Sequence, residues 1–410
     1  MQKSIHVQDL RPGMFVERLP GSWINHPFWR SRFVLEGEED RQAIIASGIA
    51  EVWIDTSKGL DVDGSAAGEP AADAAPAADA APADPQPETA ARPAPTRRVA
   101  MADEINRARN ICNDASKSVV SMFQEARLGK AIAVAEAGAL VDEISASVER
   151  NPGALISLAR LKTADDYTYM HSVAVCALMV ALSRTLGEDE ATTREAGMAG
   201  LLHDLGKALV PLEVLNKPGK LTDDEFALVK AHPEHGHRML AEGGGAGPGA
   251  LDVCLHHHER IDGRGYPHKV SGDDFSRLAR MGAICDVYDA ITSNRPYKAG
   301  WDPGESVRRM SGWCKDHLDE PVFHAFVKSI GIYPVGSLVR LSSQRLAVVV
   351  EMGAQSLLTP KVRVVLSVRS RERLAPELID LASRSVSEKI IGVENPQEWK
   401  LTGLEMLWVG

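Results

Sequence analysis

One segment of low complexity sets the domain organisation of this chain. Between Asp61 and Thr96 the sequence consists mostly of Ala, Pro, Asp, Glu and Gly and has no apolar periodicity. Repeated prolines interrupt any helix that the alanines would start. Such a composition buries too little apolar surface to offset the entropy that is lost on ordering. We therefore expect a flexible, partly extended linker over residues 61–99, with separately folded parts on either side of it.

The short block before the linker, residues 1–60, combines strand-like and helical patterns. Strand-like pieces occur at Ile5–Val7, Phe15–Arg18 and Val52–Ile54, and a helical piece covers Glu38–Ser47. This combination predicts a small α+β domain. About 60 residues are marginal for independent stability, so we expect this compact block to dock on its neighbour.

The pattern over residues 100–335 is helical. Apolar residues recur at helical spacing on both sides of Asn151-Pro152, a pair that is typical of a helix start. Further helices are predicted over His171–Thr185, Thr192–His203, Asp223–Ala231, Pro233–Leu240, Leu251–His258, Phe275–Ser293 and Pro303–Trp313. The abundance of Ala also favours helices. We expect a helical bundle here.

The last part, residues 336–410, changes character again. Val339–Leu341, Leu346–Met352 and Val362–Val368 are β-branched runs with alternation, which predicts a short β-rich extension. The expected fold is therefore mainly α, with a small N-terminal α+β domain and this C-terminal extension.

Composition excludes several classes of function. The net charge of −10 disfavours a protein that coats long nucleic acids, because neutralising phosphates dominates that affinity. The five cysteines are scattered singly without a CxxC pair, which argues against a disulfide framework and a zinc ribbon. We find no signal-peptide pattern and no run of 18 apolar residues, so we expect a cytoplasmic protein without a membrane span.

Potential metal ligands gather in short motifs within the helical region. The motifs are YTYMHS, GLLHDLGK, AHPEHG, HHHERIDGRGYP and ICDVYDA, and their candidate ligands are His171, His203, Asp204, His232, His257, His258 and Asp286. A single histidine is more often an ordinary surface or core residue, so only the set carries weight. Imidazoles and carboxylates without thiolates suit Fe, Mn, Ni or Zn. A carboxylate can also bridge two metals, and two metals about 3.5–4 Å apart can clamp a phosphodiester displacement.

The order and surroundings of these motifs resemble the HD-GYP family, a branch of the HD phosphohydrolases, over roughly residues 100–335. A His-Asp dipeptide alone is a weak signal. The sequence HHE followed by GxGYP, ahead of CDVYDAITSNRPYK, is a specific one. The N-terminal block, with LRPGMFV, HPFW and VWIDTSKG, resembles a domain of unknown function often found before HD-GYP domains.

The resemblance implies two divalent transition-metal ions, with Fe or Mn expected first. Asp204 resembles the bridging carboxylate of the family. The first metal's ligands would be His171, His203, Asp204 and Asp286, and the second's would add His232, His257 and His258. Some family members have a Glu that binds a third metal where this chain has Tyr167, so we expect a dinuclear site. The extra His256 leaves a one-residue register shift open, although counting from GYP favours His257 and His258.

The resemblance also implies roles beyond the metal ligands. Lys207, expected one turn after His203 on the same helix face, resembles the active-site lysine and is our second catalytic candidate with Asp204. Arg295 and Lys298 resemble a pair that contacts the phosphates of the ligand. Gly265, Tyr266 and Pro267 lie in the signature loop and are candidates for substrate binding. A purely structural turn is the competing interpretation of that loop.

The implied function is a metal-dependent phosphodiesterase that opens cyclic di-GMP to linear pGpG, or onward to GMP. Two alternatives stay open. One is a cyclic di-GMP sensor with little turnover that relays to a protein partner through the N-terminal domain or the signature loop. The other is an HD phosphohydrolase that acts on a different nucleotide.

Overall fold

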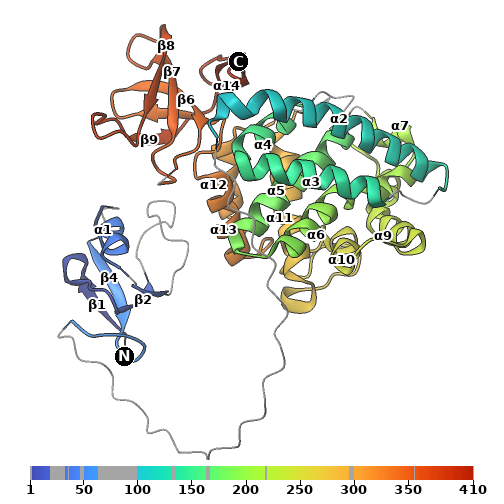
Figure 1. Ribbon diagram of the computed structural model, residues 1–410, viewed down its shortest axis with the longest axis horizontal. Coiled ribbons are helices and arrows are strands. Elements are labelled where there is room, and N and C mark those ends of the chain that lie inside the picture. The colour runs from blue at the N-terminus through green and yellow to red at the C-terminus, as the bar shows by residue number, and fades with distance from the viewer. Residues whose placement is uncertain are drawn as a thin grey trace, which may run out of the picture. The chain divides into compact units, whose positions relative to one another are not determined.

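The structure is a computed structural model of the chain, and it forms two compact units, Met1–Arg97 and Arg98–Gly410 (Figure 1). It describes residues 2–18, 33–35, 37–46, 50–62, 99–130, 134–162, 167–217, 219–294, 300–314, 316–354 and 356–409. Nearly all of the predicted linker, residues 63–98, therefore lies outside the described residues, as does the HPFW motif of the N-terminal block.

The N-terminal unit is a small α+β fold, as predicted. Its antiparallel sheet has the strand order β1-β4-β2-β3, with β1 at Gln2–His6, β2 at Phe15–Arg18, β3 at Phe33–Val34 and β4 at Glu51–Asp55. Helix α1 covers Glu38–Ala46, and a 3₁₀ turn covers Val7–Asp9. A single apolar cluster, which includes Leu10, Met14 and Ile44, holds helix and sheet together. The unit thus has a core of its own.

The second unit is a helical bundle with a sheet at its C-terminal end, which confirms the mainly α fold. Its helices up to the centre of the bundle are α2 (Met101–Arg127), α3 (Val134–Arg150), α4 (Pro152–Arg160), α5 (Tyr167–Leu186) and α6 (Glu190–Leu202). The later ones are α7 (Leu212–Leu215), α8 (Asp223–Lys230), α9 (His232–Gly243), α10 (Pro248–His256), α11 (Arg277–Thr292), α12 (Pro303–Ser311) and α13 (Glu320–Ile330). Short 3₁₀ helices cover Leu205–Leu209 (η3) and Gly272–Asp274 (η4).

Helix α5 is the centre of this bundle. Residues 170–183 are buried without a break, and α5 packs against α2, α3, α4, α6, α11 and α13 (Figure 1). A helix that is apolar on all sides belongs in a core or a membrane. Its segment Thr168–Leu186 has the length and hydropathy of a membrane span. However, 78% of its most apolar 18-residue stretch is buried inside the bundle. The hydropathy of α5 is therefore explained by its central position.

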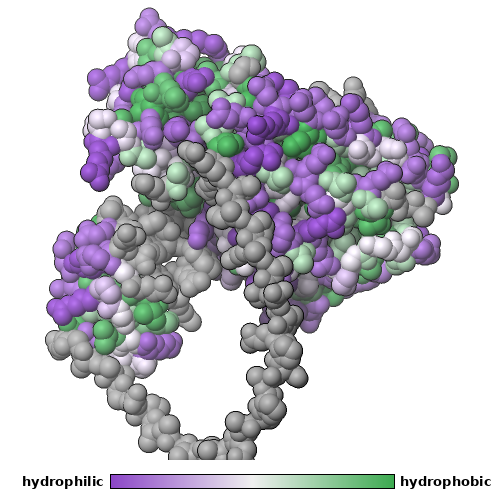
Figure 2. Space-filling model, viewed as in Figure 1, coloured by the Kyte–Doolittle hydropathy of each residue, from purple (hydrophilic) through white to green (hydrophobic). Residues whose placement is uncertain are grey.

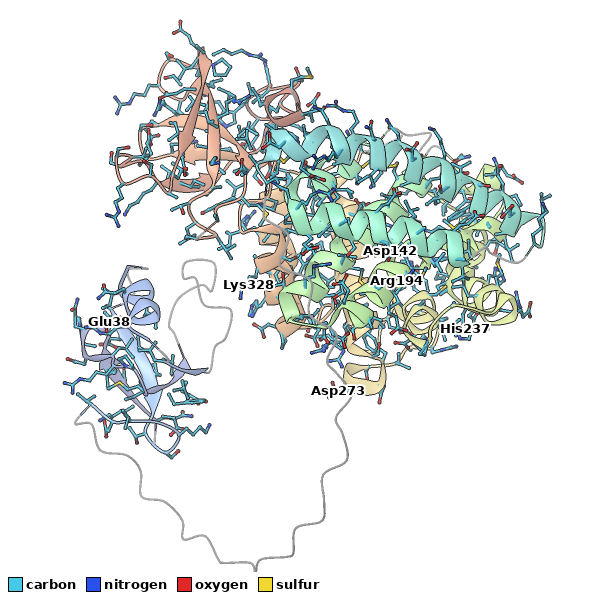
Figure 3. All side chains as sticks on the ribbon, in the orientation of Figure 1. Glu38, Asp142, Arg194, His237, Asp273 and Lys328 are labelled. Carbon is cyan, nitrogen blue, oxygen red and sulfur yellow. The ribbon has the colours of Figure 1, made fainter. Side chains whose placement is uncertain are left out.

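Polar side chains cover the outer helices of the bundle. On the face drawn in Figure 2, apolar residues form only small patches between hydrophilic ones. Asp142 of α3 and Arg194 of α6 illustrate this surface, because their side chains meet at 2.7 Å while each stays about half exposed (Figure 3). Exposed pairs of this kind contribute at most about 1 kcal/mol, so the fold depends on the buried helix faces.

The C-terminal extension is a five-stranded antiparallel sheet with the order β8-β7-β6-β5-β9. The strands are β5 (Leu338–Leu341), β6 (Arg345–Glu351), β7 (Lys361–Ser367), β8 (Arg373–Asp380) and β9 (Ile390–Val393), and a short helix, α14 (Met406–Val409), follows. The sequence predicted the three inner strands but neither edge strand. The outer strand β8 is mostly exposed and contains a proline, so it lacks the apolar alternation by which strands are recognised. The Leu338 N–H donates to Asp302 Oδ2 at 2.9 Å, which links the sheet to α12.

Val99 is the first described residue of the second unit. The Val99 N–H donates to the carbonyl of Arg150 at 3.1 Å, and the Asn151 side chain donates to the carbonyl of Val99 at 3.0 Å. This residue thus belongs with the bundle, one position earlier than the predicted domain start at residue 100.

We predict that a chain beginning at Val99 stays folded and still binds metal, because the first unit has its own core. Circular dichroism, cooperative unfolding and elemental analysis of the truncated protein would test this. A matched truncation that begins at Asp103 removes the Val99 contacts and should be less stable. An insoluble or metal-free protein from Val99 onward would show that the N-terminal unit is part of the fold of the second one.

Candidate metal centre

The loop after α6 places two of the predicted ligands at the centre of the bundle. Helix α6 ends at Leu202, and His203 and Asp204 follow it with their side chains buried. The ring of His203 donates from Nδ1 to the carbonyl of Gly200 at 2.8 Å, which leaves the Nε2 lone pair for the centre. Gly200 lets α6 approach α5 closely, since a Cβ there would lie 2.9 Å from Cys176 Cα. The close approach brings His203 beside His171 of α5.

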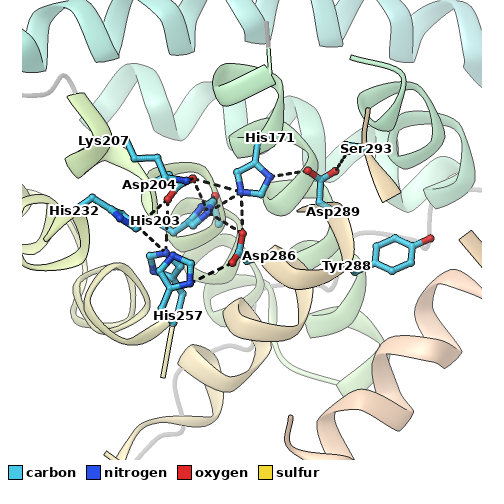
Figure 4. A network of polar contacts seen from close by, with 12 residues as sticks. His171, His203, Asp204, Lys207, His232, His257, Asp286, Tyr288, Asp289 and Ser293 are labelled. Atoms are coloured by element: carbon cyan, nitrogen blue, oxygen red, sulfur yellow. Dashed lines mark hydrogen bonds and ion pairs between the residues drawn. The ribbon is translucent and has the colours of Figure 1, made fainter. Parts of the chain in front are cut away.

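The two oxygens of Asp204 face two different pairs of histidines (Figure 4). Oδ2 lies 3.4 Å from Nε2 of both His171 and His203. Oδ1 lies 3.1 Å from Nε2 of His232 and 3.7 Å from Nε2 of His257. The potential ligand atoms converge in two groups, and Asp204 belongs to both. The first group is His171, His203 and Asp204, and the second is Asp204, His232, His257 and His258. The arrangement is the one that a bridging carboxylate requires.

The second pair of histidines comes from α9 and from the end of α10. His232 donates from Nδ1 to the carbonyl of Val229 at 2.7 Å, and His257 donates from Nδ1 to the carbonyl of Val253 at 3.0 Å. Both Nε2 atoms therefore carry lone pairs, and they face each other at 3.3 Å. The Nε2 atoms of His171 and His203 also lie 3.3 Å apart. Facing lone pairs repel one another unless a cation lies between or beside them, so both pairs fit a metal.

Asp286 of α11 closes the centre. Its Oδ1 lies 3.0 Å from Nε2 of His171, and its Oδ2 lies 3.6 Å from Nδ1 of His258. Burial would raise the pKa of Asp286, but His171 and the other histidines hold it well below its ordinary value. An ionised carboxylate is the form that binds metal.

Burial favours the neutral form, which is the form that binds metal, in three of these histidines. Burial lowers the pKa of His203 to about 3, and it also lowers the pKa values of His232 and His258. His171 differs, because hydrogen bonds to Asp286 and Asp289 outweigh the effect of burial and raise its pKa. Asp204 Oδ1 is buried and accepts no hydrogen bond from the described residues. Unprotonated imidazoles around such an oxygen fit divalent transition metals.

Lys207 lies at the centre but not on the helix that was expected. It belongs to the 3₁₀ helix η3, which follows His203 and Asp204, whereas the sequence predicted one continuous helix face from His203. Its Nζ lies 2.5 Å from Asp204 Oδ2, and its side chain is 20% exposed. Burial would raise the pKa of Asp204, but Lys207 and the histidines hold it well below its ordinary value. The ammonium group borders both Asp204 and solvent.

The signature loop packs directly on the ligands. Tyr266 stacks on the ring of His258 with centroids 4.6 Å apart, and the Tyr266-Pro267 peptide bond is cis. Gly265 has a structural reason to be glycine, since a Cβ there would lie 2.4 Å from Glu259 Cα. Buried Glu259 accepts from the N–H groups of His268 and Lys269 at 2.7 and 2.9 Å. The loop therefore supports the ring of His258. Contact between the loop and a substrate stays a prediction.

Three predicted details concern other residues. His257 and His258 lie in the cluster, whereas His256 pairs with Asp252 at 2.7 Å. Arg295 and Lys298 lie outside the described residues, which resume at Gly300. The side chain of Tyr167, where a third-metal ligand would stand, is also outside them.

The sequence interpretation missed the residues that hold His171 in place. Asp289 Oδ2 accepts from His171 Nδ1 at 2.6 Å, and Lys162 Nζ lies 2.5 Å from the same oxygen (Figure 4 shows the Asp289 contact). One signal was present, because Asp289 lies three residues after Asp286 and shares a helix face with it. Nothing local pointed to Lys162.

Comparison with known proteins adds the family context. Residues 2–137 match a domain of unknown function, DUF3391, and residues 145–322 match the HD domain. The cyclic di-GMP phosphodiesterase PA4108 of Pseudomonas aeruginosa is 53% identical over 411 residues, covering 100% of this chain and 96% of that protein. The cyclic di-GMP phosphodiesterase response regulator RpfG of Xanthomonas campestris is 40% identical over 35% of this chain and 40% of its own. A 3'3'-cGAMP-specific phosphodiesterase of Vibrio cholerae is 33% identical over 40% of this chain and 38% of its own length.

Proposed function

Since this chain belongs to the HD-GYP family, we propose that it is a metal-dependent phosphodiesterase that hydrolyses cyclic di-GMP to pGpG. The full-length relative from Pseudomonas aeruginosa supports this activity. One structural observation carries the proposal: four Nε2 atoms converge in two pairs on the two oxygens of Asp204. That geometry serves a bridging carboxylate and has no evident use in a site without cations.

We propose two divalent metal ions, Fe or Mn, at this centre. His171, His203 and Asp286 would hold one ion, His232, His257 and His258 the other, and Asp204 would bridge them. Bound there, the ions would polarise the phosphodiester oxygens and lower the pKa of a water molecule. The imidazoles and carboxylates of the group, without a thiolate, fit Fe, Mn, Ni or Zn, and the family resemblance puts Fe or Mn first.

The remaining residues of the centre would orient substrate and handle charge. Lys207 holds its ammonium group at Asp204 and at the solvent border, where it can donate to a phosphate oxygen or to the leaving oxygen. The edge of the site is formed in part by Tyr266, which keeps the ring of His258 in place. We assign substrate contact to Gly265, Tyr266 and Pro267 of this loop, and phosphate contact to Arg295 and Lys298.

The decisive experiment is anaerobic purification with elemental analysis, followed by chromatography of the products formed from cyclic di-GMP. We expect about two metal ions per chain and conversion to pGpG, and the same assay would show any onward cleavage to GMP. A parallel reaction with 3'3'-cGAMP tests the alternative substrate suggested by the Vibrio cholerae relative. Binding of cyclic di-GMP by metal-loaded protein without any product would instead identify a sensor.

We also propose a location and a partner. The five cysteines are all unpaired and buried, which supports a reducing compartment such as the cytoplasm. We propose that the N-terminal unit or the signature loop binds a protein partner, since neither is needed to supply a metal ligand.

Replacing Arg295 and Lys298 together with Ala should leave the metal content unchanged and weaken binding of cyclic di-GMP. Both side chains are protonated at neutral pH and cannot act as metal ligands. Charge-assisted contacts contribute about 1.5–3 kcal/mol each, so we expect a loss of roughly tenfold to a hundredfold per residue. Calorimetric binding and hydrolysis of a small generic phosphodiester, which should change much less, provide the measurements. Replacing exposed Arg107 and Lys117 of α2 with Ala is the control of equal charge. Loss of metal, or unchanged binding, would contradict the assignment.

A further inference from the structure

Lys162 is a lysine with no exposed side-chain surface, and it lies next to the metal centre. It follows α4 by two residues, and its side chain is 0% exposed. Its Nζ lies 2.7 Å from Asp289 Oδ1 and 2.5 Å from Asp289 Oδ2. Burying a lysine and a carboxylate together carries a large desolvation cost, which is offset only when the two groups contact each other closely, as they do here.

Asp289 passes this contact on to a metal ligand. Its Oδ2 accepts from His171 Nδ1 at 2.6 Å, and its Oδ1 lies 3.3 Å from the hydroxyl of Ser293. A carboxylate facing a lysine is an acceptor only, so Nδ1 of His171 carries the proton and Nε2 is the atom that would bind a metal between His171, Asp204 and Asp286. The direction of the His171 ring therefore depends on where Asp289 is held.

His171 is oriented differently from its neighbours. The rings of His203, His232 and His257 donate from Nδ1 to the backbone carbonyls of Gly200, Val229 and Val253. Those carbonyls are fixed by the helices to which they belong. His171 instead donates to a side chain, whose position is set by the contacts that the side chain itself makes. Within the first metal group the orientation of His171 thus depends on a buried side-chain pair, whereas His203, His232 and His257 are oriented by backbone carbonyls.

We propose that Lys162 is a positioning residue for the first metal, acting through Asp289 on His171. The inference rests on the metal centre of the proposed function. Lys162 contributes two charge-assisted hydrogen bonds that fix the Asp289 carboxylate and balance its charge. Without them Asp289 is free to turn towards other donors, and the ring of His171 loses its direction. The second group keeps its own orientation.

The test is metal binding by Lys162→Met, which keeps the length of the side chain and removes its charge. Removing an outer partner of a metal ligand typically costs about tenfold to a hundredfold in affinity. We expect this loss of affinity for only one of the two metal ions. When the metal supplied is limiting, the variant should therefore retain one ion per chain. With Mn(II), the wild type should show a spin-coupled pair by electron paramagnetic resonance and the variant an isolated ion. Lys162→Arg, which keeps the charge, should restore the coupled signal in part.

Glu104→Gln is the matched control for loss of a buried ion pair. Glu104 is 0% exposed and pairs with Arg150 at 2.7 Å, and it contacts none of the metal ligands. This variant should be less stable than the wild type but should bind two ions. If Lys162→Met does not fold, Lys162→Gln, which retains a donor, is measured in the same way and should show the same preferential loss.

Two ions bound with unchanged affinity in a folded Lys162 variant would overturn the inference, and so would equal loss of both ions. Turnover is not the readout, so the result is independent of the substrate. A wild-type protein that binds two ions but leaves cyclic di-GMP intact would contradict the proposed function and leave this inference standing.

Discussion

Replacing Asp204 with Ala is expected to remove most of the bound metal and nearly all hydrolysis of cyclic di-GMP. Each oxygen of Asp204 faces its own pair of histidine nitrogens, so the substitution deprives both groups of a ligand at once. Removing even an outer partner of a ligand costs about tenfold to a hundredfold in affinity, and a shared ligand should cost more at both positions. Lys207 would also lose the carboxylate that it contacts at 2.5 Å.

Elemental analysis and turnover, measured on the same anaerobic preparation, test this expectation. Asp204→Asn keeps the size of the side chain but not its charge, and it should lose metal to a lesser degree. Asp142→Ala, in an exposed pair with Arg194, is the control and should behave like the wild type (Figure 3). Full metal content with normal turnover in Asp204→Ala would show that Asp204 is not a bridging ligand.

The sequence predicted the members of the centre because each stands in a short motif. His203-Asp204 and His257-His258 are adjacent in the chain, and the structure brings them together with His171, His232 and Asp286 in one cluster, which is buried except at half-buried His258. The assembly itself follows from the central position of α5, the helix that carries His171. The roles of these residues in catalysis remain predictions.

The sequence did not show what orients the ligands. Lys162 and Asp289 are separated by 127 positions, so no periodic pattern relates them, and only the packing of both α4 and α11 against α5 reveals the contact. The rings of His203, His232 and His257 are held by backbone carbonyls, and the sequence does not show which carbonyl will accept a hydrogen bond from a given ring.

Element boundaries were predicted less well than element types. Helix α11 begins at Arg277, because the Ser276 side chain accepts from the Ala279 N–H and caps it, whereas the pattern suggested Phe275. Helix α13 was missed, although Asp319 caps its first turn with a bond from Val322 N at 2.9 Å. A helix cap depends on a single polar side chain, so apolar periodicity alone does not predict where a capped helix begins.

Replacing Gly206 with Ala is expected to destabilise the fold and displace the second metal. A Cβ at this position would lie 1.9 Å from the carbonyl oxygen of His232 and 2.5 Å from Gly236 N, which is far closer than atoms can approach. Both neighbours are backbone atoms of α9, so η3 and α9 must move apart. Asp204 and Lys207 lie within two residues of Gly206, and His232 begins α9. The shift would therefore lengthen the distance between Asp204 and His232. Overpacking typically costs about 1–3 kcal/mol, and we expect a loss at or above the upper end of that range.

Denaturant unfolding of the metal-free protein and metal titration of the folded protein measure the two effects separately. Gly392→Ala in β9 is the matched control, because a Cβ there meets no atom within 4 Å. Its free energy of unfolding should stay within about 0.5 kcal/mol of the wild type, as for most surface substitutions. If Gly206→Ala unfolds like that control, the contact between η3 and α9 is looser than described. If it is destabilised but binds both ions normally, the spacing of Asp204 and His232 does not depend on this contact.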